Sequence, residues 1–372
     1  MEAPQYRPGL ENVVASETTI SYLDVDNEEI VLRGYDLIEL AKQTTYLDVV
    51  GLILEGTLPT IEQRDLLEKK LIAQYFLPQE VFSILKLLPQ QTNIMDVLRT
   101  GISAIASYDD ELEDYSRDAN YRKTVRLLAK VPQIVANGYR TVTNQPILEP
   151  RKDLSYTANF LYMITGKLPT KLEEKVFDQS LIVYSEHEMP NSTFAARVIA
   201  STHSDIYGAL TGAVASLKGT LHGGVNEAVM NMLLEAGTEA NIETLMLSKL
   251  SRKERIMGFG HRVYMKKADP RAMLMKEALA VLVKEKRQQE LYNMCAAGEE
   301  VMKREKNLFP NLDYYAAPVY YLLGIPIDLF TPVFFAARTI GVCAHVIEQH
   351  ENNRLFRPRV IYKGPRNLHP PI

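Results

Sequence analysis

Apolar residues recur at helical spacing along almost the whole chain from about residue 36 onward. A repeat of about 3.6 residues predicts amphipathic helices, whereas a half-buried strand needs strict alternation. Residues 21–32 carry clustered β-formers around the turn-like pair Asp26-Asn27, which predicts a small N-terminal hairpin. No segment sustains the alternation that a large sheet requires, so the sequence predicts an all-α protein. Beyond the first linker, the expected helical runs cover residues 78–89, 93–108, 120–143, 153–166, 171–186, 191–217, 224–250, 270–306 and 332–349.

Two linkers share the pattern Gly-x-Leu-Pro-Thr-x-x-Gln/Glu, beginning at Gly56 and Gly166. In each linker the glycine suits a helix end, and the proline prevents the helix from continuing. The Thr-x-x-Gln/Glu segment then predicts a capping box for the next helix. Thr331-Pro332 predicts another helix start, with the threonine as N-cap. The acidic stretch 109–114 is expected to be a solvated surface loop.

Composition places the chain among ordinary globular proteins. Its 372 residues are 46% hydrophobic and 24% charged, which suffices for roughly two domains and a large core. The net charge of −4 gives no reason to expect nucleic acid or an anionic membrane as a partner. Cys295 and Cys343 are too few for a disulfide framework and favour a reducing compartment. The first residues lack an apolar signal segment, and no stretch approaches roughly 18 uncharged apolar residues, so we expect a cytoplasmic protein.

None of the seven histidines stands in a metal-binding pattern. His187-Glu188 lacks the second histidine of a zincin, and His345 and His350 are spaced so that they do not share a helix face. The chain also lacks a Gly-x-Ser-x-Gly elbow, a P-loop and a Gly-x-Gly-x-x-Gly turn after a strand. The motifs that usually indicate metal chemistry, phosphoryl transfer or hydride transfer are therefore missing from the sequence. We expect neither a metal nor a bound cofactor.

The segment 255–271 carries the densest candidate chemistry. Gly258 and Gly260 lead into His261, a pattern that suits a tight turn with close approach of the backbone to a ligand. Asp269-Pro270 predicts an N-cap followed by proline at the first helical position. The cations of this segment beyond His261 are Arg262, Lys266, Lys267 and Arg271. Such a loop suits a small anionic ligand, although a solvated basic loop would have the same composition.

His222 and Asp313 are two further candidates. His222 follows a small-residue helix and precedes two glycines, and Asp313 stands beside two tyrosines at a predicted helix start. A carboxylate in apolar surroundings has a raised pKa and can act as a base near neutrality. The alternatives are an ordinary helix cap for Asp313 and a satisfied turn residue for each histidine.

Six segments that follow one another along the chain resemble the motifs of citrate synthases. They are 184–194, 221–227, 258–264 with 269–271, 311–315, 337–341 and 354–358. One such segment is weak evidence, but six in the family's order are specific, and the likeness covers nearly the whole chain. The resemblance implies an all-α homodimer with the citrate synthase fold. A large domain (1–222 and 325–372) and a small domain (223–324) would enclose the active site in the cleft between them.

The resemblance also implies the catalytic roles. Asp313 would remove the α-proton of an acyl-CoA, and His222 would donate a hydrogen bond to the thioester oxygen. His261 would polarise and protonate the ketone of oxaloacetate, after which the new thioester is hydrolysed. These roles match what a desolvated base and two neutral donors can supply.

Oxaloacetate has two carboxylates, which arginines recognise by bidentate hydrogen bonds. By the same resemblance, Arg271, Arg338 and Arg357 bind these carboxylates, with His187 beside them. Arg357 would enter the site of the partner subunit, which gives the basic C-terminal tail a purpose. The residues expected to meet the phosphates of CoA, by a looser resemblance, are Arg262, Lys266 and Lys267.

Within the family, segments 186–192, 209–219 and 264–270 most resemble the 2-methylcitrate synthases of Bacillus-like bacteria, which accept propionyl-CoA and often acetyl-CoA. One methylene in a pocket is worth about 1–3 kcal/mol, so overlapping substrate use is expected. The nearest alternative is a dedicated citrate synthase of the tricarboxylic acid cycle. Alternatives from other classes are a non-catalytic helical scaffold of the same fold and a hydrolase that cleaves acyl-CoA without oxaloacetate.

Overall fold

The structure is a computed structural model that describes residues 6–24, 27, 29–260 and 268–370. Within this part of the chain sixteen α-helices carry the fold, and the strands are confined to one small N-terminal sheet. The prediction of an all-α protein is therefore confirmed.

The N-terminal sheet consists of β1 (Ser21–Asp24), β2 (Glu29–Leu32) and β3 (Tyr35–Asp36), paired antiparallel in that order. Leu23, Ile30 and Leu32 point into the core, whereas Tyr22 is exposed. This alternation is what a sheet with one buried face requires. The predicted hairpin is thus present and is extended by a third strand.

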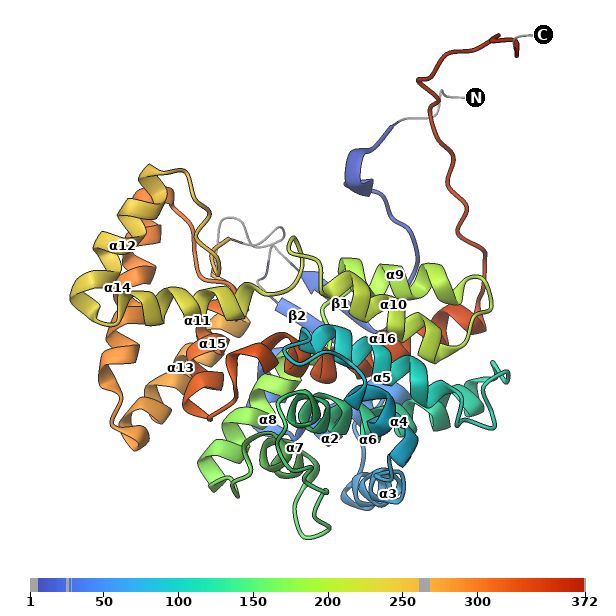
Figure 1. The fold of residues 1–372 in the computed structure, drawn as a ribbon, viewed down its shortest axis with the longest axis horizontal. Coiled ribbons are helices and arrows are strands. Elements are labelled where there is room, and N and C mark those ends of the chain that lie inside the picture. The colour runs from blue at the N-terminus through green and yellow to red at the C-terminus, as the bar shows by residue number, and fades with distance from the viewer. Residues whose placement is uncertain (1–5, 25–26, 28, 261–267, 371–372) are drawn as a thin grey trace.

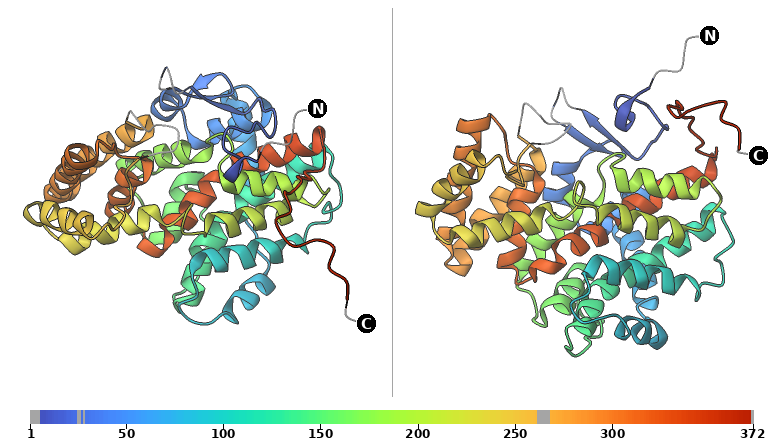
Figure 2. Two further views of the ribbon diagram at one scale, coloured as in Figure 1. Left: turned by 90° about the horizontal axis from the view of Figure 1, so that it is seen from above. Right: turned by 45° about the horizontal axis from the view of Figure 1, so that its top comes forward.

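The helices form two groups in space (Figure 1). The main body contains α1 (Leu37–Gln43), α2 (Tyr46–Glu55), α3 (Ile61–Ala73), α4 (Gln79–Lys86), α5 (Ile94–Ala106), α6 (Arg117–Val142), α7 (Tyr156–Thr165), α8 (Lys171–Ser185), α9 (Asn191–Ala200), α10 (Ile206–Leu217) and α16 (Phe330–Glu351). The second group, which we term the α11–α15 group, contains α11 (Val225–Ala236), α12 (Glu239–Ser251), α13 (Pro270–Lys286), α14 (Gln289–Lys306) and α15 (Leu312–Leu322). It lies at the left in Figure 1 and remains separate from the bulk of the main body in the turned views of Figure 2.

Local capping chemistry sets several helix ends where the sequence predicts them. Thr60 and Thr170 each form a complete capping box, and Gly56 and Gly166 end the preceding helices with φ values of 81° and 72°. The prediction for Thr331 is wrong, because α16 begins at Phe330, and its N-cap is Leu329, which forms no side-chain cap. The Thr331 hydroxyl instead accepts from Gly224 N (3.2 Å), at the start of α11.

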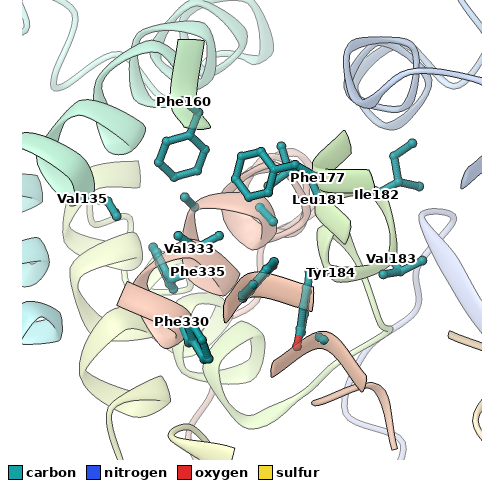
Figure 3. Packing of buried hydrophobic residues seen from close by; sticks show 14 of the residues in the cluster. Val135, Phe160, Phe177, Leu181, Ile182, Val183, Tyr184, Phe330, Val333 and Phe335 are labelled. Atoms are coloured by element: carbon teal, nitrogen blue, oxygen red, sulfur yellow. The ribbon is translucent and has the colours of Figure 1, made fainter. Parts of the chain in front are cut away.

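Helix α16 runs through the middle of the molecule (Figure 1). It packs against α2, α6, α8, α9 and α10. Its apolar residues join an aromatic core with α7 and α8, in which Phe160, Phe177, Phe330 and Phe335 are buried (Figure 3). Within the described residues, Ile327–Glu351 is the segment long and apolar enough to cross a membrane, but 89% of its most apolar window is buried inside the protein. We therefore interpret α16 as a core helix.

Both terminal segments leave the main body at the end away from the α11–α15 group (Figures 1 and 2). The C-terminal segment after Glu351 has no regular secondary structure in its described part, and Val360 and Leu368 are exposed on it. An extended, exposed and partly apolar segment of this kind is typical of an arm that packs on another molecule.

Candidate active site

Asp313 lies in the first turn of α15, where Asn311 is the N-cap and accepts from Asp313 N (3.1 Å). The side chain of Asp313 is half-buried, and the hydroxyl of Tyr184 donates to its Oδ1 over 2.6 Å. Burial raises the pKa of Asp313, while the hydrogen bond from Tyr184 and the charges of Arg271 and Arg338 oppose this shift. The net direction is upward, which is what a general base working near neutral pH needs.

The Gly258–Gly260 turn is tied to the segment that precedes α15. Gly260 N donates to Phe309 O (2.9 Å), and Asn311 N donates to Gly258 O (2.9 Å). Gly258 has φ +88°, and a Cβ there would come within 2.6 Å of Val229 Cγ2, so no other residue fits. The turn that leads to His261 therefore begins beside the helix that carries Asp313. The four residues His261, Arg262, Lys266 and Lys267 lie outside the described part of the chain.

Asp269 joins the starts of two helices at this site. It caps α13 and holds the Arg271 guanidinium through two hydrogen bonds, Nε to Oδ1 (3.1 Å) and Nη2 to Oδ2 (2.9 Å). Its Oδ2 also accepts from Leu312 N (3.2 Å), next to Asp313. Asp269 and Arg271 are both buried. The predicted N-cap is confirmed, and it also fixes Arg271 relative to the start of α15.

Arg338 projects from the middle of α16 and is buried. Its Nε donates to the carbonyl of Tyr184, and its guanidinium lies over the ring of Phe334 at 5.0 Å from the centroid. Burial lowers the pKa of Arg338 to about 10, and the charge of Glu186 works against that shift. Arg338 therefore remains a cation at neutral pH, in a place where water screens it poorly.

His222 lies in the turn after α10, close to the start of α9. Its Nε2 accepts from Ser192 N (3.2 Å) and lies 2.9 Å from Ser192 Oγ. Burial and the charge of Arg338 lower the pKa of His222 to about 4, so the ring is neutral at physiological pH. Since Nε2 accepts a backbone N–H, we assign the proton of the neutral ring to Nδ1. His222 is thus a neutral hydrogen-bond donor.

His187 and Glu186 directly follow α8, and both are buried. Glu186 Oε1 accepts from Ser21 Oγ (2.9 Å) and lies 3.2 Å from His345 Nε2. Nδ1 of His345 accepts from Arg197 Nε (3.1 Å), so the proton on its ring belongs on Nε2 and points at Glu186. Although burial acts to raise it, the pKa of Glu186 is lowered by His345, Arg338 and Ser21. The residue before His187 is therefore a buried carboxylate.

Arg357 lies apart from these residues within one chain. It is exposed on the C-terminal arm, where its Nη1 contacts Pro358 O at 3.4 Å. The arm lines a groove of about 810 Å³ together with residues of the N-terminal segment, α9 and the end of α16. This groove does not include His222, Asp313 or Arg338.

The structure therefore brings together four of the predicted site residues, namely His222, Arg271, Asp313 and Arg338. The charge of Arg338 acts on both His222 and Asp313, and that of Arg271 acts on Asp313. His187 follows the helix that carries Tyr184. Sequence reasoning assigned no role to Tyr184, Glu186 or Ser192. Their only signal was membership of segment 184–194, because the contacts that matter come from other helices. Among the described residues, no cluster of His, Cys, Asp or Glu could hold a metal ion.

Fold and site together define an all-α protein in which a half-buried carboxylate of raised pKa lies near neutral and cationic groups that suit a small anionic ligand. The model of the citrate synthase C-terminal domain matches residues 9–359, and the chain belongs to the citrate synthase family. It is 60% identical over 365 residues to the citrate/2-methylcitrate synthase of Bacillus subtilis, and 60% identical over 364 residues to the citrate synthase of Heyndrickxia coagulans. Both alignments cover 98% of each chain.

Solved structures agree with this assignment. The citrate synthase of Thermoplasma acidophilum, solved as a ternary complex with carboxymethyl coenzyme A and oxaloacetate, matches with a TM-score of 0.93 at 30% identity. That match covers 99% of this chain and 98% of the other. The citrate synthase of Pyrobaculum aerophilum matches with a TM-score of 0.90 at 36% identity, covering 97% and 93% of the two chains. The citrate synthase fold is thereby confirmed.

Proposed function

We propose that this protein condenses oxaloacetate with an acyl-CoA and hydrolyses the product thioester, acting as a 2-methylcitrate synthase on propionyl-CoA and also as a citrate synthase on acetyl-CoA. The observation that carries this proposal is the setting of Asp313. It is a carboxylate with a raised pKa, close enough to two buried arginines for their charges to act on it. A CoA thioester is the substrate, and the reaction needs no further cofactor.

In the condensation step, each proton transfer has a donor or an acceptor. Asp313 takes the α-proton of the acyl group, and His222 donates its Nδ1 proton in a hydrogen bond to the thioester oxygen, where negative charge develops. A neutral imidazole suits this task, because the pKa of His222 lies near 4. The enol carbon then attacks the ketone carbon of oxaloacetate. His261 donates a proton to the ketone oxygen, a role that rests on the family resemblance.

The carboxylates of oxaloacetate are bound by Arg271 and Arg338, with His187 beside them. Asp269 and the Tyr184 carbonyl hold the two guanidiniums before substrate arrives. Such preorganisation reduces the cost of ordering long side chains on binding. Arg262, Lys266 and Lys267 would meet the phosphates of CoA.

The two groups of helices would act as two domains, a large one of residues 1–222 and 325–372 and a small one of residues 223–324. Tyr184, Arg338 and His222 belong to the first, and Arg271 and Asp313 to the second. Closure of the domains on oxaloacetate would exclude water until condensation is complete.

The working unit would be a homodimer in which Arg357 of one subunit completes the oxaloacetate site of the other. Two observations support this. Arg357 is exposed on an arm that leaves the main body, and it lies apart from the other substrate-binding residues of its own chain. Neither nucleic acid nor a membrane is among the proposed partners, and we propose a cytoplasmic location.

The name of the Bacillus subtilis relative, citrate/2-methylcitrate synthase, supports the use of both acyl-CoA substrates. The Heyndrickxia coagulans relative, at the same identity, is named citrate synthase, which keeps a dedicated citrate synthase as the alternative. A non-catalytic scaffold is disfavoured, because packing alone gives no reason to place two buried arginines and a histidine around a carboxylate of raised pKa.

The test is release of free CoA thiol in the presence of oxaloacetate, comparing kcat/KM for propionyl-CoA and acetyl-CoA on one preparation. We expect turnover of both substrates and a preference for propionyl-CoA. A clear preference for acetyl-CoA would favour the dedicated citrate synthase. Thiol release that does not depend on oxaloacetate would instead indicate a hydrolase.

A further inference from the structure

Tyr184, in the last turn of α8, makes two polar contacts with the proposed site and is itself buried. Its hydroxyl donates to Asp313 Oδ1 (2.6 Å), and its carbonyl accepts from Arg338 Nε. Its ring packs against Phe334 with a centroid separation of 4.5 Å, and against Tyr320 with one of 6.2 Å. Tyr184 lies at the edge of the aromatic core of Figure 3. One residue thus connects that core to Asp313 through its side chain and to Arg338 through its backbone carbonyl.

The hydrogen bond from Tyr184 joins the two groups of helices. Tyr184 belongs to the main body through α8, whereas Asp313 belongs to the α11–α15 group. Arg338, on α16, is fixed to the same residue from the main-body side. The position of the base relative to Arg338 is therefore set through Tyr184 as well as through the backbone.

A carboxylate has two oxygens, and they are not equivalent here. Oδ1 of Asp313 receives the Tyr184 hydroxyl, while no side chain of the described residues donates a hydrogen bond to Oδ2. Oδ2 is thus left to accept a proton from a substrate. Burial and the negative charge of Asp313 raise the pKa of Tyr184, so the phenol keeps its proton and remains a donor. A hydrogen bond donated to the charged form of a carboxylate favours that form.

We propose that Tyr184 is a positioning residue for the condensation reaction. Its hydroxyl holds Oδ1 of Asp313 so that Oδ2 faces the acyl group. Because its carbonyl binds Arg338, it also aligns Asp313 with this arginine across the two groups of helices. This inference rests on the proposed function and deepens it.

The test is Tyr184→Phe, which removes the hydroxyl and keeps the ring. We expect kcat for oxaloacetate-dependent thiol release to fall by about 10- to 100-fold, as for loss of one hydrogen bond to a charged group. KM for oxaloacetate should stay within about twofold, since the Tyr184 carbonyl still binds Arg338. The acid limb of the kcat–pH profile should move to higher pH, because the lost hydrogen bond favoured the ionised form of Asp313.

Tyr320→Phe is the matched control. Tyr320 is another buried tyrosine that contacts the ring of Tyr184, and its hydroxyl forms no hydrogen bond with Asp313 or Arg338. It should leave kcat and the acid limb unchanged. If Tyr184→Phe raises KM for oxaloacetate but leaves the acid limb in place, Tyr184 serves only packing or Arg338, and the proposal is overturned. An unchanged kcat and acid limb would overturn it equally.

A second measurement does not depend on activity. A double-mutant cycle of Tyr184→Phe and Asp313→Ala on the urea midpoint of unfolding should be non-additive, because each change removes the same hydrogen bond. Additive midpoints would overturn the Tyr184 proposal. Absence of thiol release from the unmodified protein, with a non-additive cycle, would instead count against the proposed function alone.

Discussion

Asp313 and Glu186 are two carboxylates whose charges both act on Arg338, and burial pushes the pKa of each upward. Their final directions are opposite, since the pKa of Glu186 is lowered and that of Asp313 is raised. Glu186 accepts hydrogen bonds from Ser21 and His345. Asp313 accepts one from the neutral hydroxyl of Tyr184, and within the described residues no cation forms an ion pair with it. Under the proposed function, these partners rather than the burial separate a structural anion, Glu186, from a base, Asp313.

Asp178 shows that a raised pKa does not by itself identify a site. It accepts from Tyr46 N (2.9 Å) and from Thr157 Oγ1 (2.5 Å) and has no ion pair within the described residues. Burial raises its pKa to about 6. Yet Asp178 lies in α8, where it bonds to the start of α2, and no arginine is among the groups that act on its pKa. Identification of the base therefore needs both the pKa direction and the neighbouring cations.

The largest expected effect is that of Asp313→Asn. The amide keeps the shape of the carboxylate and can still accept from Tyr184, but it cannot take a proton. We expect thiol release to fall by about 100- to 10,000-fold, the usual contribution of a general base. Oxaloacetate binding, measured by calorimetry, should remain close to normal.

Asp178→Asn is the matched control for this change, because it also neutralises a buried aspartate of raised pKa. It should leave thiol release unchanged. Undiminished turnover in Asp313→Asn would show that Asp313 is not the general base. The difference in pKa between Asp313 and Glu186 would then have no role in catalysis.

Glu186→Gln should have a smaller effect than Asp313→Asn, and we expect this effect on stability. Gln keeps an oxygen for Ser21 and His345, but it removes the negative charge beside Arg338. We expect the free energy of unfolding at neutral pH to fall by about 1–3 kcal/mol, measured by urea denaturation.

The pH dependence sharpens this prediction. The pKa of Glu186 is lower in the folded state, so its ionised form stabilises the fold above about pH 4.3, the ordinary value for glutamate. The loss of unfolding free energy in Glu186→Gln should therefore be largest at neutral pH, and it should shrink as the pH falls through the folded-state pKa of Glu186. Ser21→Ala, which removes the hydrogen bond to Glu186 and the one accepted from Glu188 N but no charge, should lower the free energy of unfolding by less. A loss of unfolding free energy that grows as the pH falls would contradict the assignment of Glu186 as a stabilising anion.

Asp178→Asn should have the smallest effect and the opposite sign. A folded-state pKa of about 6, above the ordinary value of 3.8, means that ionisation of Asp178 costs stability as the pH rises through this range. Asn can still accept from Tyr46 and can donate to Thr157. We expect a gain of about 1 kcal/mol at neutral pH and a flatter dependence of the unfolding free energy between the two pKa values. A loss of stability at neutral pH would show that the ionised carboxylate is favourable there.

Sequence reasoning succeeded where a structural feature depends only on residues that are close together in the sequence. The capping boxes at Thr60 and Thr170 and the N-cap at Asp269 need only a few consecutive residues, and all three are present. Asp313 and Arg338 were singled out as candidates because they stand in recognisable motifs. Their surroundings were not predictable in the same way.

The contacts that were missed join distant segments. Tyr184 and Asp313 are 129 positions apart, and Glu186 and His345 are 159 apart. The acidic stretch 109–114 was expected to be solvated, but Asp109 is buried against Arg126, with an ion pair of 3.1 Å. No local pattern reveals such partners, because only the packing of helices brings them together.

The most direct test of this account is a titration of the aspartate and glutamate side-chain carboxyl carbons by ¹³C NMR, with Asp313→Asn and Glu186→Gln used to assign the two resonances. The account predicts a midpoint for Asp313 above the ordinary value of about 3.9 and one for Glu186 below its ordinary value of about 4.3. A midpoint for Asp313 at or below its ordinary value, or one for Glu186 above its own, would contradict the claim that their partners make one carboxylate a base and the other a structural anion.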